Sequence, residues 1–175
     1  MKVSDIGRGP AKPIPAELET VNGFIDMMTA KHAEFYHENP SAEFRPLLMV
    51  LCENGDLIPV MVDGFGDDNH KDLFCAQMRV AFKLWRVKSY AFAMEAWLSY
   101  AAAKEVNPDG TIDSDKSASK QSDRKEVVFT IAIDKDGNKA KSCLEIIRDY
   151  QGGAHVVPFD LPAEADFAGR FAELL

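Results

Sequence analysis

The sequence has few cysteines and no long apolar run. Its 175 residues include three cysteines, Cys52, Cys75 and Cys143. Their odd number and wide spacing exclude a Cys-x-x-Cys metal clip and disfavour a disulfide framework. Each lies in an apolar stretch, which predicts buried, reduced thiols. There is no run of about 18 uncharged apolar residues. The first residues also carry no apolar signal core, so we expect a cytoplasmic protein without a membrane partner.

The sequence also lacks the common motifs of nucleotide binding and nucleophilic catalysis. It contains no Gly-x-Gly-x-x-Gly or Walker-type loop, no Gly-x-Ser-x-Gly elbow and no His-x-x-x-His pair. Gly64-Phe65-Gly66 precedes a predicted helix, whose N-terminus suits an anion, but Asp67 and Asp68 would repel a phosphate there. We therefore predict no cofactor.

Acidic residues outnumber basic ones, 28 to 20, which gives a formal net charge of −8. This balance favours solubility and disfavours binding to a polyanion, so we predict that nucleic acid is not a partner. Hydrophobic residues make up 46% of the chain, as in ordinary globular proteins. A chain of this length can form a core without disulfides. The expected partner is another protein or a second copy of the chain.

Proline and apolar periodicity divide the chain into an arm and one domain. Residues 1–15 hold three prolines and predict an extended arm, whereas 16–175 predict a single domain with a long polar loop at 101–125. The predicted elements of the domain are a helix over 16–37, strands over 46–52 and 57–62, a helix over 69–87, strands over 89–100, 127–133 and 139–149, and a final helix that Pro162 opens.

These elements predict an α+β fold, an antiparallel sheet of about five strands flanked by helices in the order α-β-β-α-β-β-β-α. Tight turns at Asn54-Gly55-Asp56 and at 134–138 join consecutive strands as hairpins. The element order resembles that of profilin-like and roadblock-like domains. The resemblance is one of topology only, without a shared residue motif, and such folds carry unrelated functions.

The polar loop contains a partial match to a calcium-binding loop. Asp109, Asp113 and Asp115 are candidate metal ligands within residues 105–116. Lys116, however, stands where an EF-hand has its bidentate glutamate, and the flanks do not read as two helices. The loop is therefore interpreted as solvated and acidic, without a metal.

Three titratable residues are candidates for acid–base chemistry: Glu95, Asp123 and His70. Glu95 lies in an otherwise apolar strand, where a pocket carboxylate and a paired structural carboxylate look alike. We favour a cross-strand pair of Glu95 with Arg124 or Arg148, because opposite charges often face each other across strands. The alternative is a small hydrolase or metal-dependent enzyme that uses these three residues.

The second predicted helix has a wider apolar arc than one sheet face can cover. The helix is therefore expected to touch the sheet and something else, either the other helices or another subunit. We favour an interaction or assembly module without enzymatic activity, which self-associates through this helix. The candidate interface residues are Phe74, Met78, Phe82 and Trp85, with the basic residues Arg79, Lys83 and Arg86.

A further alternative is a small-ligand sensor with a pocket between helix and sheet. Its expected lining consists of the aromatic residues Phe92, Trp97 and Phe129, which lie in two predicted strands. This alternative requires the three side chains to face the same cavity.

Overall fold

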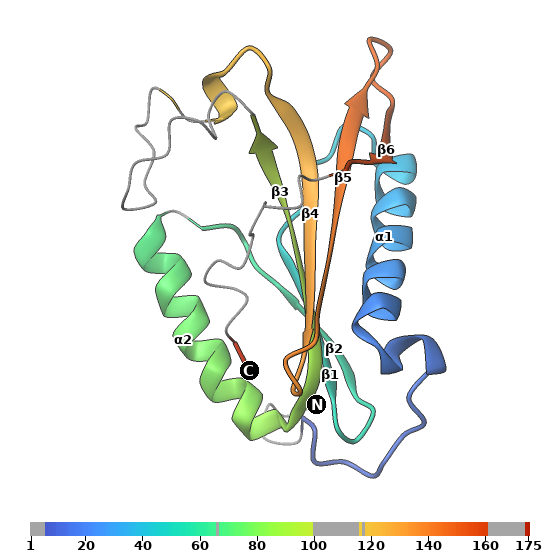
Figure 1. The fold of residues 1–175 in the computed structure, drawn as a ribbon, viewed down its shortest axis with the longest axis vertical. Coiled ribbons are helices and arrows are strands. Elements are labelled where there is room, and N and C mark those ends of the chain that lie inside the picture. Colours follow the sequence, from blue (N-terminus) through green and yellow to red (C-terminus); the bar gives the residue numbers. More distant parts are fainter. Residues whose placement is uncertain (1–5, 66, 100–115, 117, 161–173) are drawn as a thin grey trace.

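The computed structural model describes residues 6–65, 67–99, 116, 118–160 and 174–175. In this part of the chain a six-stranded sheet lies between two helices (Figure 1). The helices are α1 (Val21–Glu38) and α2 (Asp68–Trp85), and they pack on opposite faces of the sheet. The predicted α+β fold, an antiparallel sheet flanked by helices, is confirmed.

Every neighbouring pair of strands is antiparallel, and the strand order is β2-β1-β3-β4-β5-β6. The sequence predicted about five strands, and the additional one is β6. It is too short to show a clear alternation of apolar and polar residues, and it follows the Gly152-Gly153 break. The strands are β1 (Leu47–Cys52), β2 (Leu57–Met61), β3 (Val87–Leu98), β4 (Lys125–Asp134), β5 (Lys139–Arg148) and β6 (Ala154–Pro158).

Both predicted hairpin turns are confirmed. Gly55 between β1 and β2 and Gly137 between β4 and β5 each have a φ of +83°, a conformation that glycine adopts without steric cost. In the second turn, Asp134 accepts hydrogen bonds from the backbone N–H groups of Asp136 and Asn138, both at 2.9 Å. The turn residues therefore fix the register of both hairpins.

The predicted helix over 16–37 is divided in the structure. A short 3-10 helix, η2 (Ala16–Glu19), precedes α1, and Thr20 between them is extended. The Thr20 hydroxyl accepts a hydrogen bond from the N–H of Gly23 and so caps α1 (3.1 Å). A Cβ at Gly23 would lie 1.5 Å from the carbonyl oxygen of Glu17, so the close packing of η2 on α1 requires glycine there.

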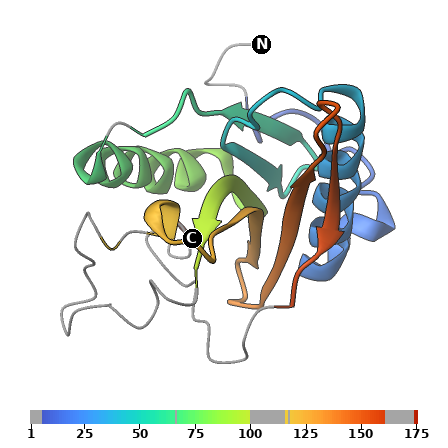
Figure 2. The same ribbon diagram turned by 90° about the horizontal axis from the view of Figure 1, so that it is seen from above.

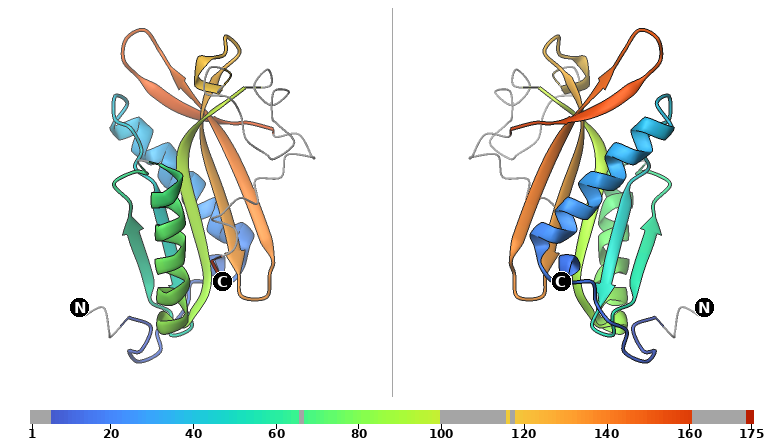
Figure 3. Two further views of the ribbon diagram at one scale, coloured as in Figure 1. Left: turned by 90° about the vertical axis from the view of Figure 1, so that its left-hand side faces the viewer. Right: turned by 90° about the vertical axis from the view of Figure 1, so that its right-hand side faces the viewer.

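The core has two halves, one on each face of the sheet. Figures 2 and 3 show the twisted sheet between its helices, with α1 crossing one face diagonally. On the α1 side, Phe24, Met28 and Tyr36 are fully buried. On the α2 side, Cys75, Met78 and Phe82 pack against residues of β1, β3 and β4, among them Leu48, Val50, Tyr90, Phe92, Ile131 and Ile133.

The described part of the N-terminal arm packs against the turn between β1 and β2. Lys12 forms an ion pair with Asp56 (2.6 Å), a carboxylate whose side chain is 8% exposed. The N–H of Gly7 donates to the same carboxylate (3.2 Å), and the side chain of Asn54 does so as well (2.9 Å). Ile6 is buried with the α2 side of the core. Asp56 therefore fastens the arm to the domain.

Two predicted segments fall largely outside the described residues. The polar loop at 101–125 is described only at 116 and 118–125, where η3 (Ala118–Lys120) leads into β4. The final helix predicted from Pro162 lies within the undescribed residues 161–173. Beyond them, Leu174 is buried on the α2 side, and its N–H donates to the Tyr90 hydroxyl (3.4 Å). The C-terminus thus lies between α2 and the sheet (Figure 1).

Candidate functional site

The three candidate acid–base residues do not meet. Glu95 lies on the α1 face of β3, the same face as Ala93. His70 lies in the first turn of α2, beyond the opposite face, where its Nδ1 atom is 3.6 Å from a carboxylate oxygen of the exposed Asp67. Asp123 precedes β4 and accepts a hydrogen bond from the Ser99 hydroxyl. The sheet therefore separates Glu95 from His70.

Glu95 is bound by α1 and by the segment before β1. The Tyr36 hydroxyl and the N–H of Phe44 (2.5 Å) both donate to its Oε1 atom. The expected direct pairing of Glu95 with Arg124 or Arg148 is not found, because the strand register places Val128 opposite Glu95. Arg148 instead bonds to Glu126, and Arg124 lies over the Trp97 ring. Burial of the Tyr36 hydroxyl and its hydrogen bond to Glu95 raise the pKa of Tyr36 well above its usual value.

The role of this carboxylate predicts the effect of Tyr36→Phe. Removing the hydroxyl leaves Glu95 with one fewer donor in a half-buried position, so we expect a loss of about 1–2 kcal/mol in the free energy of unfolding, measured by urea titration. Tyr150→Phe is the matched control, because Tyr150 is fully exposed and its variant should be unchanged. A variant at position 36 as stable as the wild type would contradict a structural role for the pair.

Arg148 closes the network around Tyr36. Its guanidinium makes two hydrogen bonds to Glu126 (2.9 and 2.7 Å) and a third to the carbonyl of Pro40 (2.8 Å). The hydrogen bonds to Glu126 raise the pKa of Arg148 above its usual value. The guanidinium also lies over the Tyr36 ring, 5.9 Å from its centroid. Arg148 therefore links β5, β4 and the end of α1.

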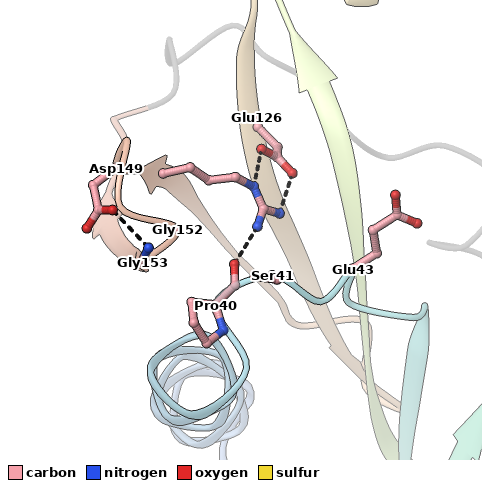
Figure 4. Close-up of a pocket in the computed structure, with 8 residues that line it drawn as sticks. Pro40, Ser41, Glu43, Glu126, Asp149, Gly152 and Gly153 are labelled. Carbon is pink, nitrogen blue, oxygen red and sulfur yellow. Dashed lines mark hydrogen bonds and ion pairs between the residues drawn. The ribbon is translucent and has the colours of Figure 1, made fainter.

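A shallow cleft of about 360 Å³ lies beside Arg148 (Figure 4). Its walls carry three carboxylates, but no histidine or cysteine. The Asp149 carboxylate accepts a hydrogen bond from the N–H of Gly153 (2.8 Å). The guanidinium of Arg148 donates to Glu126 and to the carbonyl of Pro40. The arrangement stabilises the β5–β6 connection. The lining residues are Pro40, Ser41, Glu43, Glu126, Arg148, Asp149, Gly152 and Gly153.

The aromatic residues expected to line a sensor pocket face different sides of the sheet. Phe92 and Phe129 belong to the α2 side, where Phe92 is buried and Phe129 half-buried. Trp97 pairs with Glu126 in the strand register, which places it on the α1 side. Trp97 is 45% exposed, and the guanidinium carbon of Arg124 lies over its ring, 5.1 Å from the centroid. The three side chains do not share a cavity.

Among the residues that the structure describes there is no metal site and no reactive thiol. No group of three or more His, Cys, Asp or Glu side chains converges within them. Asp109, Asp113 and Asp115 lie outside the described residues. All three cysteines are free and buried, as predicted, and burial raises the pKa of Cys52 and Cys143 to about 11. Such thiols are poor nucleophiles.

His32 is the least usual polar residue of the core. It is fully buried on the sheet-facing side of α1, and its ring meets the Phe44 ring edge-on with the centroids 4.5 Å apart. Neither ring nitrogen has a hydrogen-bond partner in the described part of the chain. Burial lowers the pKa of His32 to about 4, so the ring is neutral at physiological pH.

The apolar residues predicted for the interface lie on the core side of α2. Met78 and Phe82 are buried, whereas Phe74 and Trp85 are half-buried beside them. The predicted basic stripe is exposed. It consists of Arg79, Lys83 and Arg86, and Arg86 forms an ion pair with Glu53 (3.2 Å).

The exposed large apolar side chains of α2 are instead Leu73, Val80 and Leu84, at 57%, 61% and 53% exposure. Together with the exposed Gln77 they follow one another at steps of four, three and four residues. At 100° per residue these positions span an arc of only about 60°, opposite the core face. We call these four residues the outer stripe. The sequence shows this spacing, but not which side of the wide arc faces the sheet.

No protein-family model, curated protein or solved structure matches this chain. Within the described residues, no helix is long and apolar enough to cross a membrane. The function therefore has to be inferred from the side chains and their placement.

Proposed function

We propose that the protein is a protein-interaction or assembly module that self-associates through the outer stripe of α2. The observation that carries this proposal is the exposure of three large aliphatic side chains on one helix face, directly opposite a face that is already packed in the core. Single exposed apolar residues are common, but an aligned row of them marks an interaction surface. The four-three-four spacing is that of the contact positions in paired helices.

The edges of the sheet support a helical interface over a sheet-to-sheet one. At the β2 edge, the N–H of Val62 donates to the carbonyl of Pro46, just before β1, and so points into the sheet (3.0 Å). Backbone N–H groups alternate in direction along a strand, so the nitrogen of Pro59, three residues earlier, points away from the sheet. At the other edge, Phe159 donates inward to a carbonyl of β5 (2.9 Å), and the nitrogen of Pro158 faces outward. Each edge strand thus has a proline in place of one outward N–H donor, which disfavours pairing with another strand.

The test is the molar mass of the protein in solution, measured by light scattering behind a sizing column. The wild type is expected at about twice its chain mass of 19.4 kDa. Val80→Glu places a charge in the middle of the outer stripe and is expected to give the mass of one chain, with the helix and strand content unchanged by circular dichroism.

Met61→Glu is the matched control for this substitution. Met61 is 59% exposed, close to the 61% of Val80, but it lies on the edge strand β2. This variant should keep the mass of the wild type. A wild type with the mass of one chain would refute self-association, and a Val80→Glu variant that keeps the double mass would refute the assignment to α2.

A further inference from the structure

The outer stripe is complementary to itself when two copies of α2 run in opposite directions. In that orientation Leu73 of one copy is level with Leu84 of the other, and Gln77 is level with Val80, so the stripe matches itself about a two-fold axis. In the parallel orientation each residue would meet its own copy, which places Gln77 beside Gln77. The antiparallel register instead packs each of these amides against a valine.

The charges beside the stripe favour the same orientation. Asp72 and Lys83 are both exposed and lie on the same flank, about 80–100° around the helix from Leu73. In the antiparallel register Lys83 comes within about 3 Å, along the helix axis, of the level of the partner's carboxylate at position 72. A two-fold axis forms this contact twice. In a parallel pair the two copies of this flank would lie on opposite sides of the interface, so Asp72 of one copy and Lys83 of the other would not meet.

We propose that two copies of this chain dimerise by antiparallel pairing of their α2 helices, with the two-fold axis between Met78 and Arg79. This inference rests on the proposed function, because it requires that the outer stripe is an interface. It adds the orientation and register of the partner. It also explains why both leucines lie at the ends of the stripe, where each covers the other across the axis.

Cysteine cross-linking distinguishes the two orientations. In the antiparallel pair, Leu73 and its own copy are about 16 Å apart along the helix axis, too far for a disulfide, which needs Cα atoms within about 7 Å. The double variant Leu73→Cys/Leu84→Cys should therefore form covalent dimers after oxidation with diamide, whereas each single variant should not. The wild type is the control, because its cysteines are buried.

Each outcome has a distinct meaning. Covalent dimers from the double variant alone support antiparallel pairing, and covalent dimers from either single variant overturn it in favour of a parallel pair. A wild type of double mass whose double variant does not cross-link overturns the register, while self-association stands. A wild type with the mass of one chain overturns both proposals.

Charge reversal gives an independent readout of the same register. Lys83→Asp should weaken dimerisation roughly tenfold, because it faces the partner's acidic position twice. Adding Asp72→Lys to that variant should restore the affinity of the wild type, measured by the concentration dependence of the mass. Failure of the second change to restore affinity would overturn the proposed contact between these two positions.

Discussion

Replacing His32 with leucine is expected to stabilise the protein by about 1–2 kcal/mol at pH 7. The buried ring contributes packing area, but its nitrogens gain no hydrogen bond from the described residues to offset the loss of water. Leucine has a similar volume, so the space under α1 stays filled. Urea unfolding of the two proteins, followed by circular dichroism, measures the difference.

His32→Leu is also expected to make the free energy of unfolding depend less on pH below about pH 6.5. Burial lowers the pKa of His32 from 6.5 to about 4, so between these values the unfolded chain binds a proton that the folded chain does not. The contribution of the neutral His32 ring to the free energy of unfolding is therefore fully present above about pH 6.5. It is lost as the pH is lowered toward 4. At 1.36 kcal/mol per pKa unit, the loss through His32 amounts to about 3 kcal/mol.

The pH effect is read as a difference between two curves, since carboxylates also titrate in this range. The control is His37→Gln, on the exposed side of the same helix, which should keep the acid dependence of the wild type. Parallel curves for the wild type and His32→Leu would contradict the assignment. A loss of stability in His32→Leu at pH 7 would show that the histidine nitrogens are hydrogen-bonded in solution.

Gly7→Ala is expected to lower the free energy of unfolding by about 3 kcal/mol or more. Gly7 has a φ of +69°, and a Cβ there would lie 1.9 Å from the carbonyl oxygen of Trp85, a backbone atom that cannot rotate away. An alanine in this backbone conformation already costs about 1–3 kcal/mol. The clash adds to that cost, up to the point at which the arm detaches from the domain. Detachment would expose Ile6 and remove two of the three hydrogen bonds to Asp56.

Gly9→Ala is the matched control two residues along the same arm. A Cβ at Gly9 would meet only the side-chain nitrogen of Asn54, at an ordinary contact distance of 3.7 Å, so we expect a change within about 0.5 kcal/mol. Urea unfolding gives both values, and amide exchange shows whether residues 6–12 have lost their protection. Equal stability of the two variants would contradict the close approach of the arm to Trp85.

The arm also connects to the proposed interface through α2. The carbonyl that meets Gly7 belongs to the last residue of that helix, next to Leu84 at the end of the outer stripe. Asp56 holds the other side of the arm, and its pKa lies below its usual value because Lys12 and Asn54 donate hydrogen bonds to it. We therefore expect a detached arm to loosen the end of α2.

Local pattern in the sequence determined most of the secondary structure. Alternating apolar residues predicted β3 and β4, and Gly55 and Gly137 predicted the two tight turns, because a strand repeats every two residues and these turns need a positive φ. The wide apolar arc of α2 was likewise visible, as were the buried thiols. Each of these features depends on residues close together in the chain.

The tertiary structure decided which residues meet. Glu95 pairs with Tyr36, 59 residues away, instead of with Arg124 or Arg148. The outer stripe can be told apart from the core side of α2 only in the folded protein, where the sheet, the arm and Leu174 cover the other half of the helix. Periodicity shows that a residue belongs to an apolar face, but the partner of that face is set by contacts between segments far apart in sequence, which no local pattern records.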